Sequence, residues 1–136
     1  SAMATSSGMG EGVEDSCMSV WSMPSGAQVF AHESFTHAYA GTGIEVHGTN
    51  GSIFGRGVMT QRPAGTVELV SADGRKEVPF SAHSLYEQAV NRFMEAASGN
   101  GRPAADGTDG VKSLSIAEAV KAAAETGQRT AVRSTP

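Results

Sequence analysis

The chain is poor in the features that mark several large classes of proteins. It has a single cysteine, Cys17, which has no partner for an internal disulfide and no Cys-x-x-Cys companion. Its 10 lysines and arginines are scattered and are outnumbered by 14 acidic residues, so the net charge is -4 and no basic patch attracts a phosphate backbone. These absences exclude a disulfide scaffold, predict no nucleic-acid partner, and indicate a reducing, cytoplasmic compartment.

Long apolar runs are also absent. A membrane-spanning helix needs about 20 consecutive apolar residues, and no stretch of the sequence comes near that length. The first residues lack the charged and apolar regions of a signal peptide, so no membrane partner is predicted. With 136 residues, of which 39% are hydrophobic, the chain is long enough for one domain with its own core and too short for two.

Motifs for nucleotide, metal and nucleophilic chemistry are missing as well. The glycine pairs at 41–43 and 55–57 lack the third glycine of a dinucleotide fingerprint, and neither opens an evident helix. If Gly110 is aligned with the glycine of an EF-hand loop, three ligand positions hold residues without a side-chain oxygen. His32 and His37 are five residues apart, and a continuing strand would send them to opposite faces. No metal site, nucleotide-binding motif or nucleophile elbow is therefore predicted.

The most informative stretch that is present runs from Ala40 to Ile53. Its first glycines flank Thr42 and allow a close approach of another backbone. The alternation that follows places two apolar side chains on one face and Glu45 and His47 on the other, before a turn at residues 50–51. Glu45 and His47 could bind a polar ligand, or they are solvated cross-strand partners.

A hairpin is predicted from Cys17 to Phe35, with its turn at residues 24–26. In that register Trp21 faces Val29, and large apolar groups lie on both faces of the hairpin. Both faces therefore need cover. Helices can cover one face of the hairpin. Because the other face is also apolar, we predict that the chain self-associates there as a homo-oligomer.

A second hairpin is predicted at residues 66–80. The Asp-Gly pair at 73–74 suits the loop of a type I′ turn, which would place Leu69 opposite Val78. Pro79 cannot donate a hydrogen bond to a neighbouring strand. The second strand of this hairpin is therefore either an edge strand or leaves the sheet at its end.

The apolar period changes from two to about 3.6 at Ser84. Ser84 is a cap with Glu87 as its capping-box partner, and Gly99 ends this first helix. A second helix is predicted from about Val111 to Thr126, after an acidic entry that complements the helix dipole. The whole pattern predicts an α+β fold: a mostly antiparallel sheet with two C-terminal helices packed on one face and the other face available for oligomerisation.

The two ends of the chain carry little pattern. The first residues, Ser-Ala-Met, resemble what is left after removal of a tag, and residues 1–12 are small, polar and glycine-rich. A flexible tail is predicted there, in a piece cut from a longer protein. Residues 13–132 form the predicted domain and residues 133–136 a second short tail.

Several stretches occur together in an order that resembles a known family. They are the glycine-flanked strand and turn at 41–53, the helix at 86–93, the turn at 101–103, and the acidic entry at 109–110 to an alanine-rich helix ending at Gly127. This combination is similar to the C-terminal domain of the glucose-fructose oxidoreductase and inositol 2-dehydrogenase (Gfo/Idh/MocA) family. The resemblance covers residues 13–132.

The resemblance implies a parent protein that is an NAD- or NADP-dependent oxidoreductase acting on a sugar, polyol or related hydroxy compound. Members of the family join an N-terminal dinucleotide-binding domain to an α+β domain whose sheet helps shape the substrate pocket and often forms subunit contacts. The family's glycine fingerprint, its Glu-Lys-Pro lysine and its catalytic Asp and His lie upstream, and no equivalent occurs here. No catalytic, cofactor-binding or metal residue is expected in this chain, and the fragment alone is expected to be inactive.

By the same resemblance, the segment that holds His37, Tyr39 and Thr42 is the expected wall of a substrate pocket. Each residue also has an ordinary interpretation: a solvated histidine, a half-buried tyrosine, and a threonine that closes a loop hydrogen bond. Tyr86, at the start of the first helix, could approach a pocket or pack on the sheet. The alternative function is a module that binds a ligand or oligomerises without catalysis.

Overall fold

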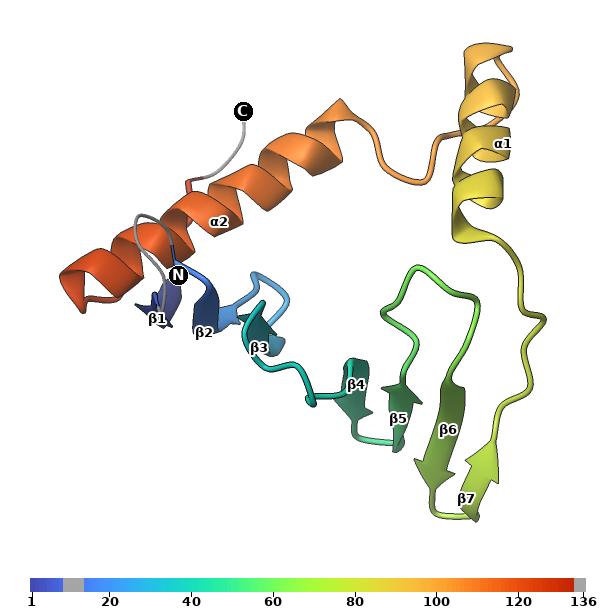
Figure 1. Ribbon diagram of the computed structural model, residues 1–136, viewed down its shortest axis with the longest axis horizontal. Helices are drawn as coiled ribbons and strands as arrows, with labels where there is room; N and C mark the ends of the chain where they lie inside the picture. Colours follow the sequence, from blue (N-terminus) through green and yellow to red (C-terminus); the bar gives the residue numbers. More distant parts are fainter. Residues whose placement is uncertain (9–13, 134–136) are drawn as a thin grey trace. The chain divides into compact units, whose positions relative to one another are not determined.

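The computed structural model describes residues 1–8 and 14–133. These described residues form seven strands and two helices (Figure 1): β1 (Ala2–Ser7), β2 (Ser16–Ser22), β3 (Gln28–Ser34), β4 (Gly43–Gly48), β5 (Gly51–Arg56), β6 (Thr66–Ser71), β7 (Gly74–Glu77), α1 (Leu85–Ala97) and α2 (Gly107–Thr126). They divide into two compact units. The first unit is Ser1–Ala38 with Ala105–Pro136, and the second is Tyr39–Ala104. The antiparallel α+β fold predicted from the sequence is confirmed.

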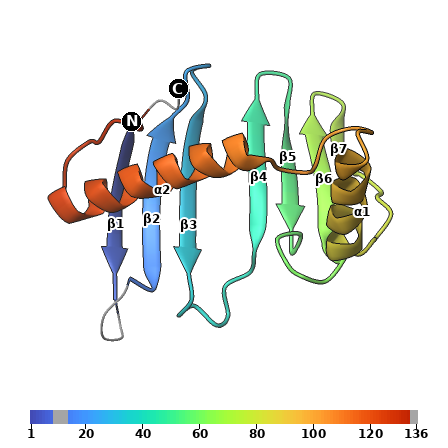
Figure 2. The same cartoon turned by 90° about the horizontal axis from the view of Figure 1, so that it is seen from above.

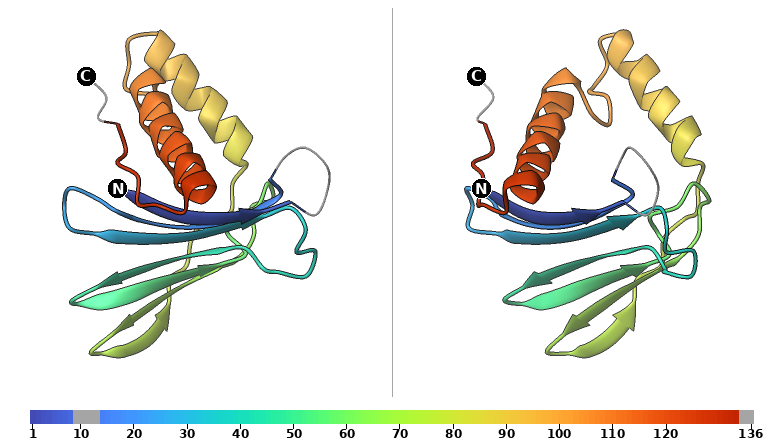
Figure 3. Two further views of the ribbon diagram at one scale, coloured as in Figure 1. Left: turned by 90° about the vertical axis from the view of Figure 1, so that its left-hand side faces the viewer. Right: turned by 60° about the vertical axis from the view of Figure 1, so that its left-hand side comes forward.

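The first unit is a three-stranded antiparallel sheet in the order β1-β2-β3, with α2 lying across it (Figure 2). Trp21 pairs with Val29, so the predicted register of the first hairpin is confirmed. Figure 3 shows α2 on one face of this sheet, where it contacts β1. The buried hydrophobic residues of the described chain are Ala2 in β1 and Ala119 and Ala123 in α2. Their methyl side chains let the helix approach the strand closely.

The start of β1 is tied to the segment that follows α2. The amide of Ala2 donates to the Thr130 carbonyl at 2.7 Å, and the Thr130 amide donates to the Ala2 carbonyl at 2.9 Å. The Arg129 Nε also donates to Ser1 Oγ at 2.7 Å. The segment that follows α2 is therefore fixed to the start of β1.

The prediction of a flexible tail at residues 1–12 is wrong for β1. This strand pairs with β2 along its whole length, from Ala2 opposite Trp21 to Ser7 opposite Ser16. Small residues carry a weak strand signal in the sequence, yet a small residue is what the contact with α2 requires. Residues 9–12 of the predicted tail, and 134–136 at the other end, lie outside the described residues.

The second helix starts earlier than predicted, at Gly107 rather than Val111. Asp106 accepts hydrogen bonds from the amides of Thr108 at 2.8 Å and Asp109 at 3.1 Å, and Asp109 accepts in return from the Asp106 amide at 3.2 Å. This reciprocal capping box satisfies donors that the first turn of a helix leaves free. The predicted stop at Gly127 is confirmed, with a left-handed φ of 65°.

The second unit is a four-stranded antiparallel sheet in the order β4-β5-β6-β7. Val46 pairs with Ile53 and His47 with Ser52, so the predicted alternation along β4 is confirmed. The turn lies one residue earlier than predicted, because Gly48 pairs with Gly51 and residues 49–50 form the loop.

The register predicted for the hairpin at residues 66–80 is wrong. Ser71 pairs with Gly74, which leaves residues 72–73 as the loop, and Leu69 meets Lys76 instead of Val78. A type I′ turn would need a positive φ at Asp73, but every positive φ among the described residues belongs to a glycine, and Gly74 takes φ 106°. As predicted, β7 is an edge strand, and it ends before the proline that follows.

Helix α1 has the predicted start, since Ser84 Oγ accepts a hydrogen bond from the Glu87 amide at 3.3 Å. Gly99 follows its end with φ 80°. No residue of α1 is buried, and Val90 and Phe93 on it are 60% and 62% exposed. Of the two helices, α2 therefore has a packed face and α1 has none within the described residues. Neither helix in this part of the chain is long and apolar enough to cross a membrane.

Cys17, in β2, is half-buried and unpaired. Burial raises the pKa of its thiol, and the negative charges of Glu14 and Glu33 raise it further. Glu33 is the cross-strand partner of Cys17 in β3. The thiol is therefore held in its protonated, unreactive form near neutral pH.

We expect a large difference between two glycine substitutions in the second unit. Gly65 and Gly74 have nearly equal positive φ values, 108° and 106°, so alanine is strained at both. A Cβ at Gly65 would lie 2.5 Å from the Arg56 carbonyl oxygen, whereas nothing lies within 4 Å at Gly74. Gly74→Ala should cost about 1 kcal/mol and Gly65→Ala at least ~2 kcal/mol more. Urea unfolding of both variants measures the two losses in unfolding free energy. Equal losses would contradict a clash between the new Cβ at position 65 and the Arg56 carbonyl oxygen.

The thiol of Cys17 should react slowly with iodoacetamide at pH 8 compared with an unstructured cysteine peptide, because the raised pKa leaves less thiolate. Glu33→Gln removes one of the charges that raise this pKa, so it should speed the reaction and move its pH midpoint downward. Glu77→Gln, in the second unit, is the matched control and should change neither. An unchanged pH midpoint of the reaction in Glu33→Gln would contradict the claim that the charge of Glu33 raises the pKa of the Cys17 thiol.

Candidate functional site

The three predicted pocket residues are all exposed. His37 follows β3 in the first unit, and Tyr39 and Thr42 precede β4 in the second. Tyr39 is fully exposed at 104%, which excludes the half-buried interpretation, and Phe35 nearby is 94% exposed. The carbonyl of Thr42 accepts a hydrogen bond from the Gly57 amide at 2.7 Å, so Thr42 does close a loop through its backbone. The role of these residues in a pocket wall stays a prediction.

His32 and His37 come together, which the strand spacing did not predict. β3 ends at Ser34, whose Oγ accepts from the Thr36 amide at 3.2 Å and turns the chain. The two imidazole rings then meet edge to face, with centroids 5.2 Å apart and planes at 64°. Opposite faces were expected only for a continuing strand, and β3 does not continue past Ser34. Among the described residues, no group of three or more His, Cys, Asp or Glu side chains is arranged to hold a metal ion.

One face of the β4-β5-β6-β7 sheet carries a chain of polar contacts, which we name the polar face. His47 Nδ1 lies 2.9 Å from Ser52 Oγ, and its Nε2 lies 3.5 Å from Glu45 Oε2. Arg56 Nη2 lies 3.9 Å from the other oxygen of Glu45. The cross-strand interpretation of Glu45 and His47 is therefore confirmed. Although serine, histidine and glutamate are the residues of a hydrolase triad, the His47 side chain is 59% exposed on a strand, and among the described residues neither an enclosing pocket nor a helix start adjoins it to stabilise an oxyanion.

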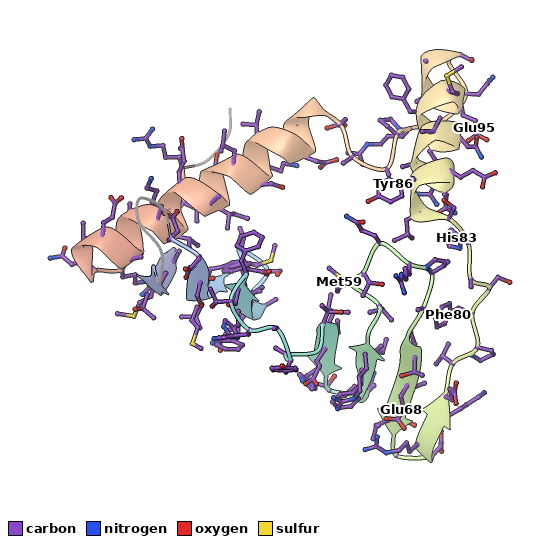
Figure 4. All side chains as sticks on the ribbon, viewed as in Figure 1. Met59, Glu68, Phe80, His83, Tyr86 and Glu95 are labelled. Atoms are coloured by element: carbon purple, nitrogen blue, oxygen red, sulfur yellow. The ribbon has the colours of Figure 1, made fainter. Side chains whose placement is uncertain are left out.

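Phe54 lies at the centre of the polar face. Its ring meets that of His47 edge to face at 5.5 Å, and the guanidinium carbon of Arg75 lies 6.0 Å from its centroid. Arg75 also forms an ion pair with Glu68 (Glu68 is labelled in Figure 4). A shallow hollow of about 170 Å³ adjoins this ring and is lined by charged side chains of both signs. Ion pairs as exposed as those of Glu45 with His47 and Arg56 contribute little to stability.

A second hollow, of about 220 Å³, is mostly apolar. It lies beside the start of α1, and Phe80 and His83 from its lining are labelled in Figure 4. The His83 ring is oriented by contacts of 3.1 Å to the Ser81 carbonyl and 2.9 Å to Gln88 Oε1. Ligand pockets usually hold about 300–1,000 Å³, so this hollow has the size for a single side chain or a very small ligand. None of the three predicted pocket residues lines it.

Comparison with known proteins identifies the family. The model of the oxidoreductase family C-terminal alpha/beta domain (GFO_IDH_MocA_C) matches residues 4–132, beginning within β1 rather than at the expected residue 13. The chain is 49% identical over 128 residues to 1,5-anhydro-D-fructose reductase of Ensifer adhaerens. That match covers 93% of this chain and 38% of the relative, so the chain spans little more than a third of the relative's length.

Solved structures share the fold. Aldose-aldose oxidoreductase from Caulobacter crescentus, complexed with glycerol, matches with a TM-score of 0.81 and 19% identity, covering 93% of this chain and 39% of that one. An oxidoreductase from Agrobacterium radiobacter, in complex with NAD+, L-tartaric acid and magnesium, matches with a TM-score of 0.69 and 17% identity, covering 93% and 41%. At these identities the likeness is one of fold. Together with the family match, it places this chain among the C-terminal domains of the Gfo/Idh/MocA oxidoreductases.

Proposed function

We propose that this chain is the substrate-binding and assembly domain of an NAD- or NADP-dependent oxidoreductase that acts on a sugar, polyol or related hydroxy compound. The observation that carries the proposal is the 49% identity to 1,5-anhydro-D-fructose reductase over nearly the whole chain. The reaction would move a hydride between the carbinol carbon of the substrate and the nicotinamide ring. In such chemistry the cofactor supplies the hydride carrier, and the protein supplies position and a proton relay.

The two glycine pairs among the described residues do not fit a dinucleotide. The glycine pair at 41–43 leads into β4 and the pair at 55–57 closes β5, so neither opens a helix whose amides could face a pyrophosphate. The two helices start at Leu85 and Gly107, each behind an ordinary capping side chain. We therefore assign cofactor binding and the catalytic residues to the part of the parent protein that this chain does not contain.

The contribution of this chain to the substrate site would come from His37, Tyr39 and Thr42. An imidazole, a phenol and a hydroxyl can all hydrogen-bond to the hydroxyl groups of a sugar or polyol. Large aromatic side chains are normally at least half-buried, whereas Phe35 and Tyr39 on either side of His37 are 94% and 104% exposed. A segment that presents its aromatic and polar groups in this way is suited to a ligand.

The assembly role would fall to the face of the first sheet opposite α2. Met3, Val20 and Phe30 are adjacent across β1, β2 and β3 by register, and they are 52%, 46% and 70% exposed. Met18, 45% exposed, extends the same face. A self-complementary apolar face of this kind suits a second copy of the chain around a two-fold axis.

A domain that oligomerises or binds a ligand without catalysis is the alternative function, and the same apolar face favours it. A cytoplasmic location, favoured by the single cysteine, belongs to the same proposal.

The catalytic proposal is tested with the 136-residue chain and with the longer oxidoreductase that contains it. The longer protein should turn over 1,5-anhydro-D-fructose or an aldose with NADH or NADPH, or inositol with NAD+ or NADP+, and the chain alone should turn over none of them. Tyr39→Ala should lower kcat/KM of the longer protein about tenfold, equivalent to ~1.4 kcal/mol. Turnover by the chain alone, or an unchanged kcat/KM in Tyr39→Ala, would contradict the assignment.

The assembly proposal is tested by sedimentation of the chain at high concentration. The wild-type chain should associate, and Phe30→Asp should shift it to the monomer because a charge would be buried in the interface. Phe35→Asp alters a phenylalanine that is also exposed, at 94%, but lies outside the strands, and it should leave association unchanged. A wild-type monomer at high concentration would rule out the interface.

A further inference from the structure

Two of the three asparagines in the sequence, Asn50 and Asn100, are followed by glycine. An Asn-Gly pair supports a spontaneous reaction whose only co-reactant is water. The backbone nitrogen of the glycine attacks the side-chain carbonyl carbon of the asparagine, and the side-chain nitrogen leaves as ammonia with the proton of the glycine N–H. Water then opens the resulting five-membered succinimide at either carbonyl, which gives aspartate or isoaspartate. Glycine favours the attack because it has no Cβ to hinder the approach.

The hairpin of β4 and β5 restrains the pair at Asn50. Gly51 is the first residue of β5 and pairs with Gly48, so its backbone closes the hairpin. A Cβ on Gly51 would lie 2.6 Å from the Val70 carbonyl oxygen, so β6 approaches this backbone closely as well. An amide held within paired strands reacts only when the pairing opens locally. The Gly51 nitrogen is therefore kept from the Asn50 side chain for as long as the sheet is intact.

The pair at Asn100 lies in an open segment. It follows α1, outside the helices and strands, and Gly99 and Gly101 on either side have positive φ values of 80° and 100°. Among the described residues, nothing lies within 4 Å of a Cβ built on either glycine. The Asn100 amide donates to the Glu95 carbonyl at 2.8 Å, but the reacting nitrogen is that of Gly101, which belongs to no paired strand. The approach to the Asn100 side chain is therefore not opposed by sheet structure.

We propose that Asn100 is a site of spontaneous deamidation, at which ageing of the protein replaces a neutral amide with a carboxylate, whereas the folded hairpin protects Asn50. The reaction does not depend on the proposed function. It requires the backbone freedom at Gly101 and water, and both are available at the exposed turn after α1.

The new charge would lie just beyond the C-terminus of α1. The last carbonyl groups of a helix carry partial negative charge, so a nearby carboxylate is unfavourable. The last turn of α1 contains no basic residue to offset that charge, and no side chain of the helix is buried. Deamidation should therefore lower the helix-to-coil ratio of this turn about two- to fivefold.

The reaction is tested by incubating the 136-residue chain at neutral pH and physiological temperature. Peptide mass spectrometry follows each asparagine, and chromatographic separation of the isomers identifies isoaspartate. Asn100 should react within about twofold of the rate of a free peptide of its own sequence, and Asn50 at least about tenfold more slowly than its peptide. In guanidinium chloride Asn50 should reach the peptide rate, because strand pairing is lost. Asn91, which is followed by arginine, is the internal control and should stay intact.

Equal rates at Asn50 and Asn100 in the folded chain would overturn the proposal, as would an Asn50 rate that guanidinium chloride leaves unchanged. Gly101→Ala should slow the reaction at Asn100 without changing that at Asn50, since the new Cβ hinders the attack. Products at position 100 that contain aspartate and no isoaspartate would rule out the succinimide route.

The consequence for α1 is tested separately with Asn100→Asp, which supplies the charge directly. The Cα chemical shifts of Ala96 and Ala97 should move toward their random-coil values. Asn50→Asp, in the hairpin, is the matched control and should leave both shifts unchanged. Equal shifts in Asn100→Asp and the wild-type chain would overturn the effect of the charge on the helix.

Discussion

The contact between α2 and β1 is the interaction on which the first unit depends. Ala119 and Ala123 of the helix and Ala2 of the strand are the buried hydrophobic residues of the described chain, and all three belong to this unit. Because their side chains are single methyl groups, any larger residue would push the helix away from the strand. The backbone bridge between Ala2 and Thr130 then closes the unit beyond the helix.

The second unit has no comparable anchor within the described residues. Gly55 is its one buried residue there, and no side chain of α1 is buried. A helix of 13 residues is marginal in water without a packed face. The apolar side chains of α1 and of β4, with Val90 60% and Val46 56% exposed, are therefore suited to be covered by another part of a larger protein.

Turn and cap residues made much of this fold predictable. The hairpin from Cys17 to Phe35 was predicted in its correct register because its turn has one suitable geometry. The hairpin at 66–80 was not, because the sequence does not reveal whether Asp73 takes a positive φ. β1 was missed because the alanines that suit its helix contact carry little strand signal. In the candidate site, the turn at Ser34 that joins His32 to His37 depends on a side-chain hydrogen bond, which strand spacing alone does not predict.

Amide hydrogen exchange of the chain tests this account most directly, because exchange reports which elements are anchored. If the contact of α2 with β1 is the anchor, the amides of β1, β2 and the second half of α2 should exchange slowest. The amides of α1 should exchange at rates close to those of an unfolded peptide, since none of its side chains is buried. Protection of α1 equal to that of α2, measured on a monomer, would contradict the claim that α1 awaits a partner surface.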